Sequence, residues 1–320
     1  MVTLTDIEHA RVSIRDWIKK TPLVRSRFLS DHCGGEVYLK LENLQVTNSF
    51  KIRGALNRML ALSPEEKRRG VIAASSGNHG QAVAVCAEKL NLAATVVVPE
   101  NAPRVKIEKI RKHQVELILH GAIYDQTEQY ARELAREKGL TFISAYNDPV
   151  VVAGQGTVGL EILEDLPRVN SIIVPVSGGS ILGGIAVAVK NLKRDTEIIG
   201  VQPETVAAMY HSLKAGKITD IEMKDTVADG LSGNIEKGSV TFELIQRYVD
   251  EIMLYDEHTI KRMIRLLWEK ERQVVEGSGA IAIAPIMASP KGFAQKQTVA
   301  VITGGNIDDE VFQRILLDGA

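Results

Sequence analysis

The sequence has few cysteines, few aromatic residues and almost no net charge. Its two cysteines, Cys33 and Cys86, are too few and too far apart in 320 residues for a disulfide framework, and no Cys-x-x-Cys metal spacing exists. With 39 basic and 40 acidic residues, the formal net charge is −1. No overall field therefore favours nucleic acid or an anionic membrane. We expect a reduced, cytoplasmic protein that binds neither.

Long hydrophobic runs are also missing. Apolar stretches such as residues 93–98 are far too short to span a bilayer, and residues 1–20 have no apolar signal-peptide segment. What remains is an ordinary globular composition, 45% hydrophobic and 25% charged. The length permits two domains of roughly 150 residues, or one larger domain.

Strand-like and helix-like segments alternate along the chain. A helix is predicted over residues 5–17, with Thr5 as its N-cap and Glu8 in the capping-box position. Later segments switch repeatedly between short apolar runs and helical periodicity. The predicted strands are residues 36–41, 70–74, 94–98, 115–119, 141–144, 171–176, 197–201, 252–255 and 298–302. Such alternation predicts an α/β fold, with helices on the faces of parallel sheet.

One lysine stands in apolar surroundings at the start of a predicted helix. Lys51 lies between Phe50 and Ile52, after the polar turn 47–49. A lysine that loses hydration has a lowered pKa and becomes nucleophilic enough to form a Schiff base. The alternative is a surface lysine whose stem lies along Phe50.

Three polar turns each follow a predicted strand. Residues 177–184 read Ser-Gly-Gly-Ser-Ile-Leu-Gly-Gly and suit a phosphate, although they match neither a Walker A nor a G-x-G-x-x-G motif. Residues 75–80 (Ser-Ser-Gly-Asn-His-Gly) suit a carboxylate or a ring oxygen, and residues 303–306 follow the last strand. Each alone could be a tight turn or a helix cap. Together with Lys51 they favour one phosphorylated ligand gripped from several sides.

In order, these segments resemble the threonine dehydratase and serine racemase family of pyridoxal phosphate enzymes, of fold type II. The matching segments are residues 48–55, 75–82, 153–157, 174–184, 228–230 and 302–306. The resemblance implies two open, twisted, mostly parallel α/β domains with pyridoxal 5'-phosphate in the cleft. The large domain would combine residues 1–62 and 147–320, and residues 63–146 would form a small mobile domain.

The resemblance also implies roles for individual residues. Lys51 would hold the cofactor as a Schiff base and remove the Cα proton, while Phe50 would lie near the ring. Asn78 would donate to the ring hydroxyl, and Thr303 would face the pyridine nitrogen. The phosphate is expected at Ser177, Gly178, Gly179, Ser180, Ile181 and Leu182, with Gly230 and Glu276 also near the cofactor. The substrate carboxylate is expected at Ser75, Ser76, Gly77, Asn78 and His79.

The activity implied is β-elimination from a hydroxyamino acid, L-threonine or L-serine by default, giving a 2-oxo acid and ammonia. An alternative is an amino-acid racemase, in which Ser76 protonates the opposite face of Cα. Others are a dehydratase for a bulkier or modified substrate, such as a hydroxyectoine-derived acid or 3-phenylserine, and a non-enzymatic amino-acid sensor that holds the cofactor. The partner is thus a small amino acid, and the resemblance suggests a homodimer.

The sequence departs from the family pattern at several positions. Asn48 stands where glycine is common, and Ser177 and Ser180 replace glycines of the phosphate loop. Gln202 and Ala208 match the positions of the family's activating cation site, so we expect no metal there. No motif identifies the side-chain pocket, which we expect around Tyr124, residues 146–147 and residues 231–233.

Overall fold

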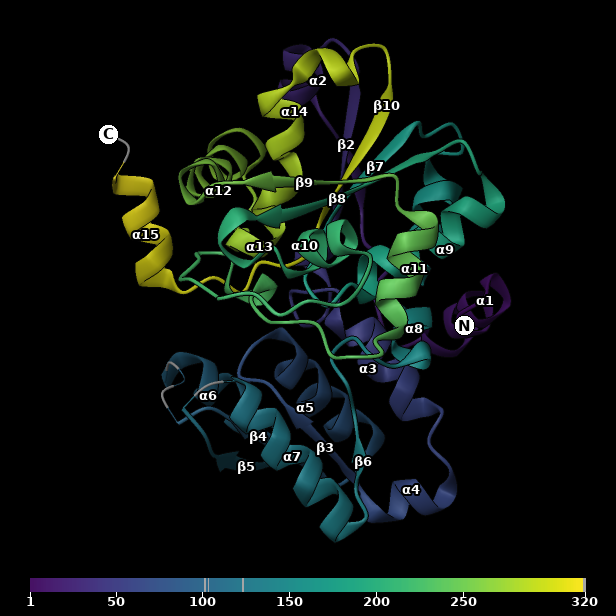
Figure 1. The fold of residues 1–320 in the computed structure, drawn as a ribbon, viewed down its shortest axis with the longest axis vertical. Coiled ribbons are helices and arrows are strands. Elements are labelled where there is room, and N and C mark those ends of the chain that lie inside the picture. The colour runs from purple at the N-terminus through teal and green to yellow at the C-terminus, as the bar shows by residue number, and fades with distance from the viewer. Residues whose placement is uncertain (101, 103, 123, 319–320) are drawn as a thin grey trace.

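The strands of the protein form two separate sheets. A computed structural model describes residues 1–100, 102, 104–122 and 124–318. The strands are β1 (Leu23–Ser26), β2 (Glu36–Leu41), β3 (Val71–Ala74), β4 (Ala94–Val98), β5 (Glu116–Leu119), β6 (Thr141–Phe142), β7 (Ser171–Pro175), β8 (Glu197–Pro203), β9 (Glu251–Tyr255) and β10 (Gln297–Ile302). One sheet has the order β1-β2-β10-β7-β8-β9 and the other β5-β4-β3-β6. Figure 1 shows them as an upper and a lower body.

Helices cover both sheets. They are α1 (Leu4–Ile14), α2 (Arg27–Cys33), α3 (Lys51–Leu60), α4 (Pro64–Arg69), α5 (Asn78–Leu90), α6 (Arg104–Arg111), α7 (Tyr124–Lys138), α8 (Pro149–Asp165), α9 (Ser180–Leu192), α10 (Ala208–Ala215), α11 (Val240–Tyr248), α12 (Glu257–Glu271), α13 (Gly277–Ala280), α14 (Ala284–Ala288) and α15 (Asp309–Leu317). In the described ranges, none is both long and apolar enough to cross a membrane.

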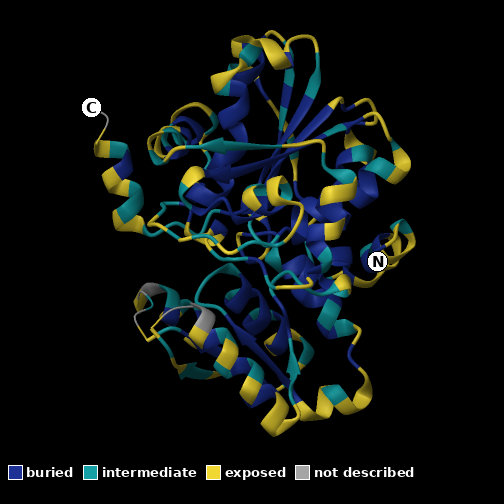
Figure 2. Ribbon diagram, in the orientation of Figure 1, coloured by how far each residue is buried: buried dark blue, intermediate teal, exposed yellow. Residues whose placement is uncertain are grey.

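The six-stranded sheet is parallel except at one edge, where β1 runs antiparallel to β2. All five residues of β7 are buried, as are most of β8 and β10, because helices cover both faces. Figure 2 shows this buried centre beneath an exposed outer layer. Gly154 of α8 allows close packing on α3, since a Cβ there would lie 2.6 Å from the carbonyl oxygen of Arg53.

The four-stranded sheet is parallel throughout. Every residue of β3 and β4 is buried, and α5, α6 and α7 flank these strands (Figure 1). The chain passes from one sheet to the other after α3 and returns after β6. Arg58 of α3 forms an ion pair with each of the two connecting segments. Its Nη2 lies 3.3 Å from Glu66 Oε1 and its Nε lies 3.1 Å from Asp148 Oδ2.

The mostly parallel α/β prediction is confirmed, and one local prediction is wrong. The N-cap of α1 is Thr3, whose Oγ1 accepts from the N–H of Asp6 at 3.2 Å, so the capping box is not made by Thr5 and Glu8. Both pairs fit the capping-box spacing. The earlier start brings Leu4 into the helix, where it packs against the apolar cluster that contains Ile7 and Ala10.

Candidate active site

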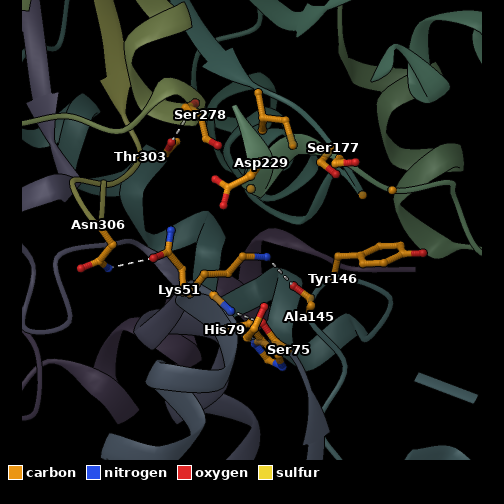
Figure 3. Close-up of a pocket in the computed structure, with 18 of the residues that line it drawn as sticks. Lys51, Ser75, His79, Ala145, Tyr146, Ser177, Asp229, Ser278, Thr303 and Asn306 are labelled. Atoms are coloured by element: carbon orange, nitrogen blue, oxygen red, sulfur yellow. Dashed lines mark hydrogen bonds between the residues drawn. The ribbon is translucent and has the colours of Figure 1, made fainter. Parts of the chain in front are cut away.

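A cavity of about 550 Å³ is lined by loops from both sheets. The four-stranded sheet contributes the turn after β3, and the six-stranded sheet contributes the turns after β7 and β10. Figure 3 shows Lys51 in its centre, with Ser177 and Tyr146 on one side and Asn306 on the other. The segments predicted to bind one ligand are therefore brought together.

Helices α3, α5 and α9 begin at this cavity without a side-chain cap. Phe50 is the N-cap of α3, Gly77 of α5 and Gly179 of α9, and none of them makes a side-chain capping bond. The first N–H groups of a helix have no partner within it, and its N-terminal end has a partial positive charge. The cavity is accordingly suited to anionic groups.

Lys51 is the first residue of α3 and is partly buried. Its Nζ donates to the carbonyl of Ala145 at 3.0 Å and lies 5.1 Å from the ring centroid of Phe50. Burial lowers the pKa of this amine to about 8, although the Glu276 carboxylate partly opposes the shift. The amine is therefore partly unprotonated near neutral pH, which a nucleophile or a base requires.

The glycine–serine turn requires glycine at two positions, one for its backbone conformation and one for a close packing contact. Gly179 has φ +88°, in the left-handed region that favours glycine, and a Cβ on Gly178 would overlap the ring of Tyr146. Ser177, Gly178, Gly179, Ser180 and Ile181 line the cavity. Leu182 does not, because its side chain is fully buried in the core. Only its backbone N–H, in the first turn of α9, remains for a ligand.

Thr303 and Ser278 form the wall opposite that turn (Figure 3). Thr303 is buried, and its Oγ1 donates to the carbonyl of Ser278 at 3.2 Å. The Oγ of Ser278 is buried with no partner in the described part of the protein. Gly230 lies against it, since a Cβ there would be 2.8 Å from this oxygen. An unpartnered buried hydroxyl is costly, so it indicates that a ligand completes the site.

Asn78 and Glu276 meet in the cavity. The Nδ2 of Asn78 donates to Oε1 of Glu276 at 2.7 Å, and both residues line the cavity. Burial raises the pKa of the Glu276 carboxyl to about 7, and Asp229 adds to the shift, whereas the bond from Asn78 opposes it. Glu276 is consequently poised between its charged and neutral forms at neutral pH.

Ser75, Ser76 and Gly77 line the cavity and are partly buried, and the N–H of Gly77 donates to Ser75 Oγ at 3.1 Å. His79 also lines the cavity, and its ring has a main-chain partner. Its Nε2 lies 2.8 Å from the carbonyl of Ile143, and burial, followed by the charge of Lys51, lowers its pKa to about 3. A neutral imidazole that donates from Nε2 has a lone pair at Nδ1. The ring is therefore a poor carboxylate donor, and the backbone N–H is the better candidate.

Several cavity residues were not identified from the sequence as individual contacts. Tyr146 and residues 231–233 do line the cavity, as the unassigned pocket segments suggested, whereas the side chain of Tyr124 lies outside the described residues. The missed residues are Gln81, Pro99, Lys106, Lys109, Ile110, Ala145, Pro175, Met223, Asp229, Asn234, Ser278 and Asn306. Asn306 ends the third polar turn, and Ser278 lies two residues after Glu276. Both therefore stood close to a recognised signal.

Two predicted departures have local structural counterparts. Asn48 has φ +53°, a conformation that glycine and asparagine tolerate best, and it is not among the described residues that line the cavity. Gln202 is buried, and its Oε1 accepts from the N–H of Tyr210 at 2.9 Å. Within the described ranges, no group of three or more His, Cys, Asp or Glu residues is placed to hold a metal ion.

Comparisons with known proteins agree with this geometry. Residues 14–304 match the family model described as pyridoxal-phosphate dependent enzyme. The chain is 44% identical to an L-threonine ammonia-lyase of Thermotoga maritima, over all of this chain and 79% of the relative. Among solved structures, maize serine racemase superposes with a TM-score of 0.92 at 31% identity, covering 99% of this chain and 97% of that one. A threonine deaminase of Solanum lycopersicum also gives 0.92, at 34% identity over 98% and 92%. This chain therefore belongs to the family of pyridoxal-phosphate dependent enzymes.

Proposed function

We propose that the protein is an ammonia-lyase that releases ammonia from a β-hydroxy amino acid, with L-threonine or L-serine as the default substrate. One observation supports this most directly: Lys51 lies in one cavity with the Ser177–Ile181 turn, Asn78 and Thr303. The 44% identity to a protein named L-threonine ammonia-lyase supports the same reaction. The net change converts L-threonine into 2-oxobutanoate and ammonia, because the water lost in the elimination is regained in hydrolysis.

The cavity fits pyridoxal 5'-phosphate, the cofactor of this family. The uncapped end of α9 and the Ser177–Ile181 turn suit its phosphate, and the lowered pKa of Lys51 suits its attachment as a Schiff base. Asn78 suits the ring oxygen, while the unpartnered Ser278 Oγ and the Thr303 hydroxyl suit the ring nitrogen side. When bound, the cofactor supplies an electron sink for the bond that breaks at Cα.

The chain's own residues then orient the substrate and move protons. The uncapped start of α5, with Ser75, Ser76 and Gly77, is suited to the α-carboxylate. Lys51 is the proposed base for the Cα proton, since its amine is partly free near neutral pH. In the described residues, the Thr303 hydroxyl bonds to a main-chain carbonyl and not to a carboxylate. A hydroxyl beside the ring nitrogen of the cofactor would provide no permanent negative charge to stabilise a protonated nitrogen. We take this to favour elimination over longer-lived carbanion chemistry.

The decisive experiment fixes the cofactor and assays the products separately. Purified protein should be yellow, and borohydride reduction followed by peptide mass spectrometry should place the cofactor on Lys51. A panel of β-hydroxy amino acids should then release ammonia and a 2-oxo acid. A fixed cofactor without turnover on any member would point to an amino-acid sensor and overturn the lyase proposal. Reduction at another lysine would overturn the site.

Racemisation is the second candidate, and Ser76 is the residue that favours it. Ser76 lines the cavity from the turn after β3, and two structures with high TM-scores are serine racemases, from maize and Dictyostelium discoideum. A hydroxyl there could return a proton to the face of Cα opposite Lys51. Inversion of L-serine, measured by chiral chromatography and lost in Ser76→Ala while ammonia release persists, would establish this activity. Equal loss of both reactions would assign Ser76 to carboxylate binding.

We further propose that residues 63–146 move as one domain relative to residues 1–62 and 147–320, and that this motion opens the cavity. The separate four-stranded sheet within that span supports the division. We propose a homodimer on the family resemblance, testable by light scattering. A cytoplasmic location is also proposed, supported by two cysteines that are both free.

A further inference from the structure

The side chain of Asn306 connects three segments that meet beside the cavity. It lies on the loop after β10, where Figure 3 shows it at one side of the cavity. Its Nδ2 donates to the carbonyl of Thr47 at 2.9 Å and to Oδ1 of Asn78 at 2.8 Å. A third acceptor, Oε1 of Gln81, lies at 3.2 Å. An amide nitrogen has only two hydrogens, so the two shorter contacts account for both.

These partners fix which way each amide points. The main-chain carbonyl of Thr47 only accepts, so the nitrogen of Asn306, and not its oxygen, must face it. The same nitrogen also faces Asn78, which must therefore present its oxygen to Asn306 and its nitrogen to Glu276. Because the main-chain carbonyl of Thr47 can only accept, the orientation of both amides follows from the hydrogen-bond pattern itself.

If the amide of Asn78 were rotated by 180°, both of its hydrogen bonds would be lost. Its nitrogen would face the donor nitrogen of Asn306, and its oxygen would face the Glu276 carboxylate. In the observed orientation, one N–H of Asn78 is used by Glu276 at 2.7 Å. The second has no partner in the described part of the chain, and Asn78 lines the cavity. Two neighbours therefore hold a free N–H donor beside the site.

We propose that Asn306 is a positioning residue that, with Glu276, holds the Asn78 amide so that its second N–H serves the ring oxygen of the cofactor. Asn306 follows the last strand of the six-stranded sheet, whereas Asn78 begins the helix that packs on the four-stranded sheet. The donor is thus correctly oriented only when the two sheets are together. This inference rests on the proposed function, because it assumes a cofactor attached to Lys51.

A double-mutant cycle tests the proposal. Asn306→Asp keeps the shape of the side chain but removes the donor, so Asn78 is free to flip and present an acceptor to the ring oxygen. We expect the dissociation constant of pyridoxal 5'-phosphate, titrated into apoprotein by fluorescence, to rise about tenfold, the effect of one lost hydrogen bond to a charged group. The visible absorbance of the bound cofactor should also shift.

The second arm of the cycle is Asn78→Ala. If Asn306 acts through Asn78, adding Asn306→Asp to Asn78→Ala should change cofactor affinity by less than about twofold. Additive losses in the double variant would overturn the proposal, as would an unshifted spectrum in Asn306→Asp. Asn306→Ala removes the same donor with a smaller side chain and replaces the aspartate variant if that protein does not fold. Asn191→Asp, on the exposed end of α9, controls for the added charge.

The same measurements separate this inference from the proposed function. If borohydride fixes the cofactor on Lys51 but Asn78→Ala leaves cofactor affinity and spectrum unchanged, the inference fails and the lyase proposal stands. If no cofactor is fixed in the wild-type protein, the proposed function itself fails.

Discussion

Two cations of α3 lie two residues apart and experience opposite environments. Arg53 is fully buried, with Nε 2.8 Å from Glu42 Oε2 and Nη1 2.6 Å from Glu161 Oε1. Burial alone would lower its pKa, but these two carboxylates outweigh burial and raise it. Lys51 is also withdrawn from water and makes no ion pair in the described residues, so burial lowers its pKa to about 8.

The comparison separates a structural charge from a reactive one. Lys40 joins the Arg53 cluster, with Nζ 2.6 Å from Glu161 Oε2, so two cations balance two carboxylates in a buried network. Every charge there is compensated, which fixes the start of α3 against β2 and α8. Lys51 has no carboxylate ion-pair partner in the described residues, so its amine loses its proton more readily, and a Schiff base requires the unprotonated amine. The network around Arg53 thus fixes the position of Lys51, whose own charge is left without an ion-pair partner.

The largest effect should come from Lys51→Met, which removes the uncompensated cation. Ammonia release should fall by about 10⁴-fold, because both the base and the point of cofactor attachment are lost. The Lys51 pKa is lowered from 10.5 to about 8 in the folded protein, so the penalty of burying its charge is full below pH 8 and vanishes above pH 10.5. At pH 7, the apoprotein of the Lys51→Met variant should therefore be more stable than the wild-type apoprotein, by about 1 kcal/mol in the free energy of unfolding measured in urea. A less stable variant would contradict this view of Lys51.

Next in size is Arg53→Met, which breaks the compensated cluster. Two buried carboxylates, Glu42 and Glu161, would lose their main partner. We expect the free energy of unfolding to fall by about 3–5 kcal/mol, measured in urea. Arg104→Met is the matched control, because the Arg104–Glu108 pair lies on the exposed surface of α6 and should change stability by less than about 0.5 kcal/mol. If both variants lost a similar amount of unfolding free energy, the proposed difference between the buried cluster and an exposed ion pair would be contradicted.

Glu276→Gln should give a smaller, pH-dependent effect. The carboxyl pKa is raised from 4.5 to about 7 in the folded protein, so its protonated form contributes stability below pH 4.5 that is lost as the pH rises through 7. The glutamine variant should flatten the dependence of apoprotein stability on pH between 5 and 8, and gain about 1 kcal/mol at pH 8. Parallel wild-type and variant curves would show that Glu276 titrates normally.

The smallest effect is expected from Lys106→Met. Lys106 on α6 pairs with Asp229 on the other side of the cavity, but both side chains remain partly exposed to solvent. An ion pair of this kind contributes no more than about 1 kcal/mol. We expect KM for L-threonine to rise about twofold at low ionic strength, with the difference disappearing at 0.5 M salt. Arg69→Met, which removes an exposed pair on α4, should leave KM unchanged.

The fold and the centre of the site were predictable because their signals are local. Lys51 stands beside Phe50 at a helix start, and the turn at 177–181 follows a buried strand, so both patterns lie within a few residues. By contrast, β1 (Leu23–Ser26) and α2 (Arg27–Cys33) were not predicted. β1 is a four-residue edge strand with two exposed residues and one fully buried residue, and it lacks the apolar alternation of an interior strand.

The rest of the site depends on contacts that no local pattern reveals. Asn306 and Asn78 are separated by 228 residues and meet only because both turns end at the same cavity. The ring of His79 contacts the carbonyl of Ile143, a pairing that the sequence gives no means of predicting, and the carboxylate contact proposed for this residue stays a prediction. The compensation of Arg53 likewise comes from Glu42 and Glu161, on separate elements.

The guanidinium of Arg58 bears on how the proposed small domain would move. It binds Glu66 just after the chain leaves the larger sheet, and Asp148 just as the chain returns. Because both connections bind the same side chain, we expect their movements to be coupled. Their common anchor would act as a pivot, so that opening becomes a rotation about the base of α3, with the widest displacement at the far rim where α6 lies.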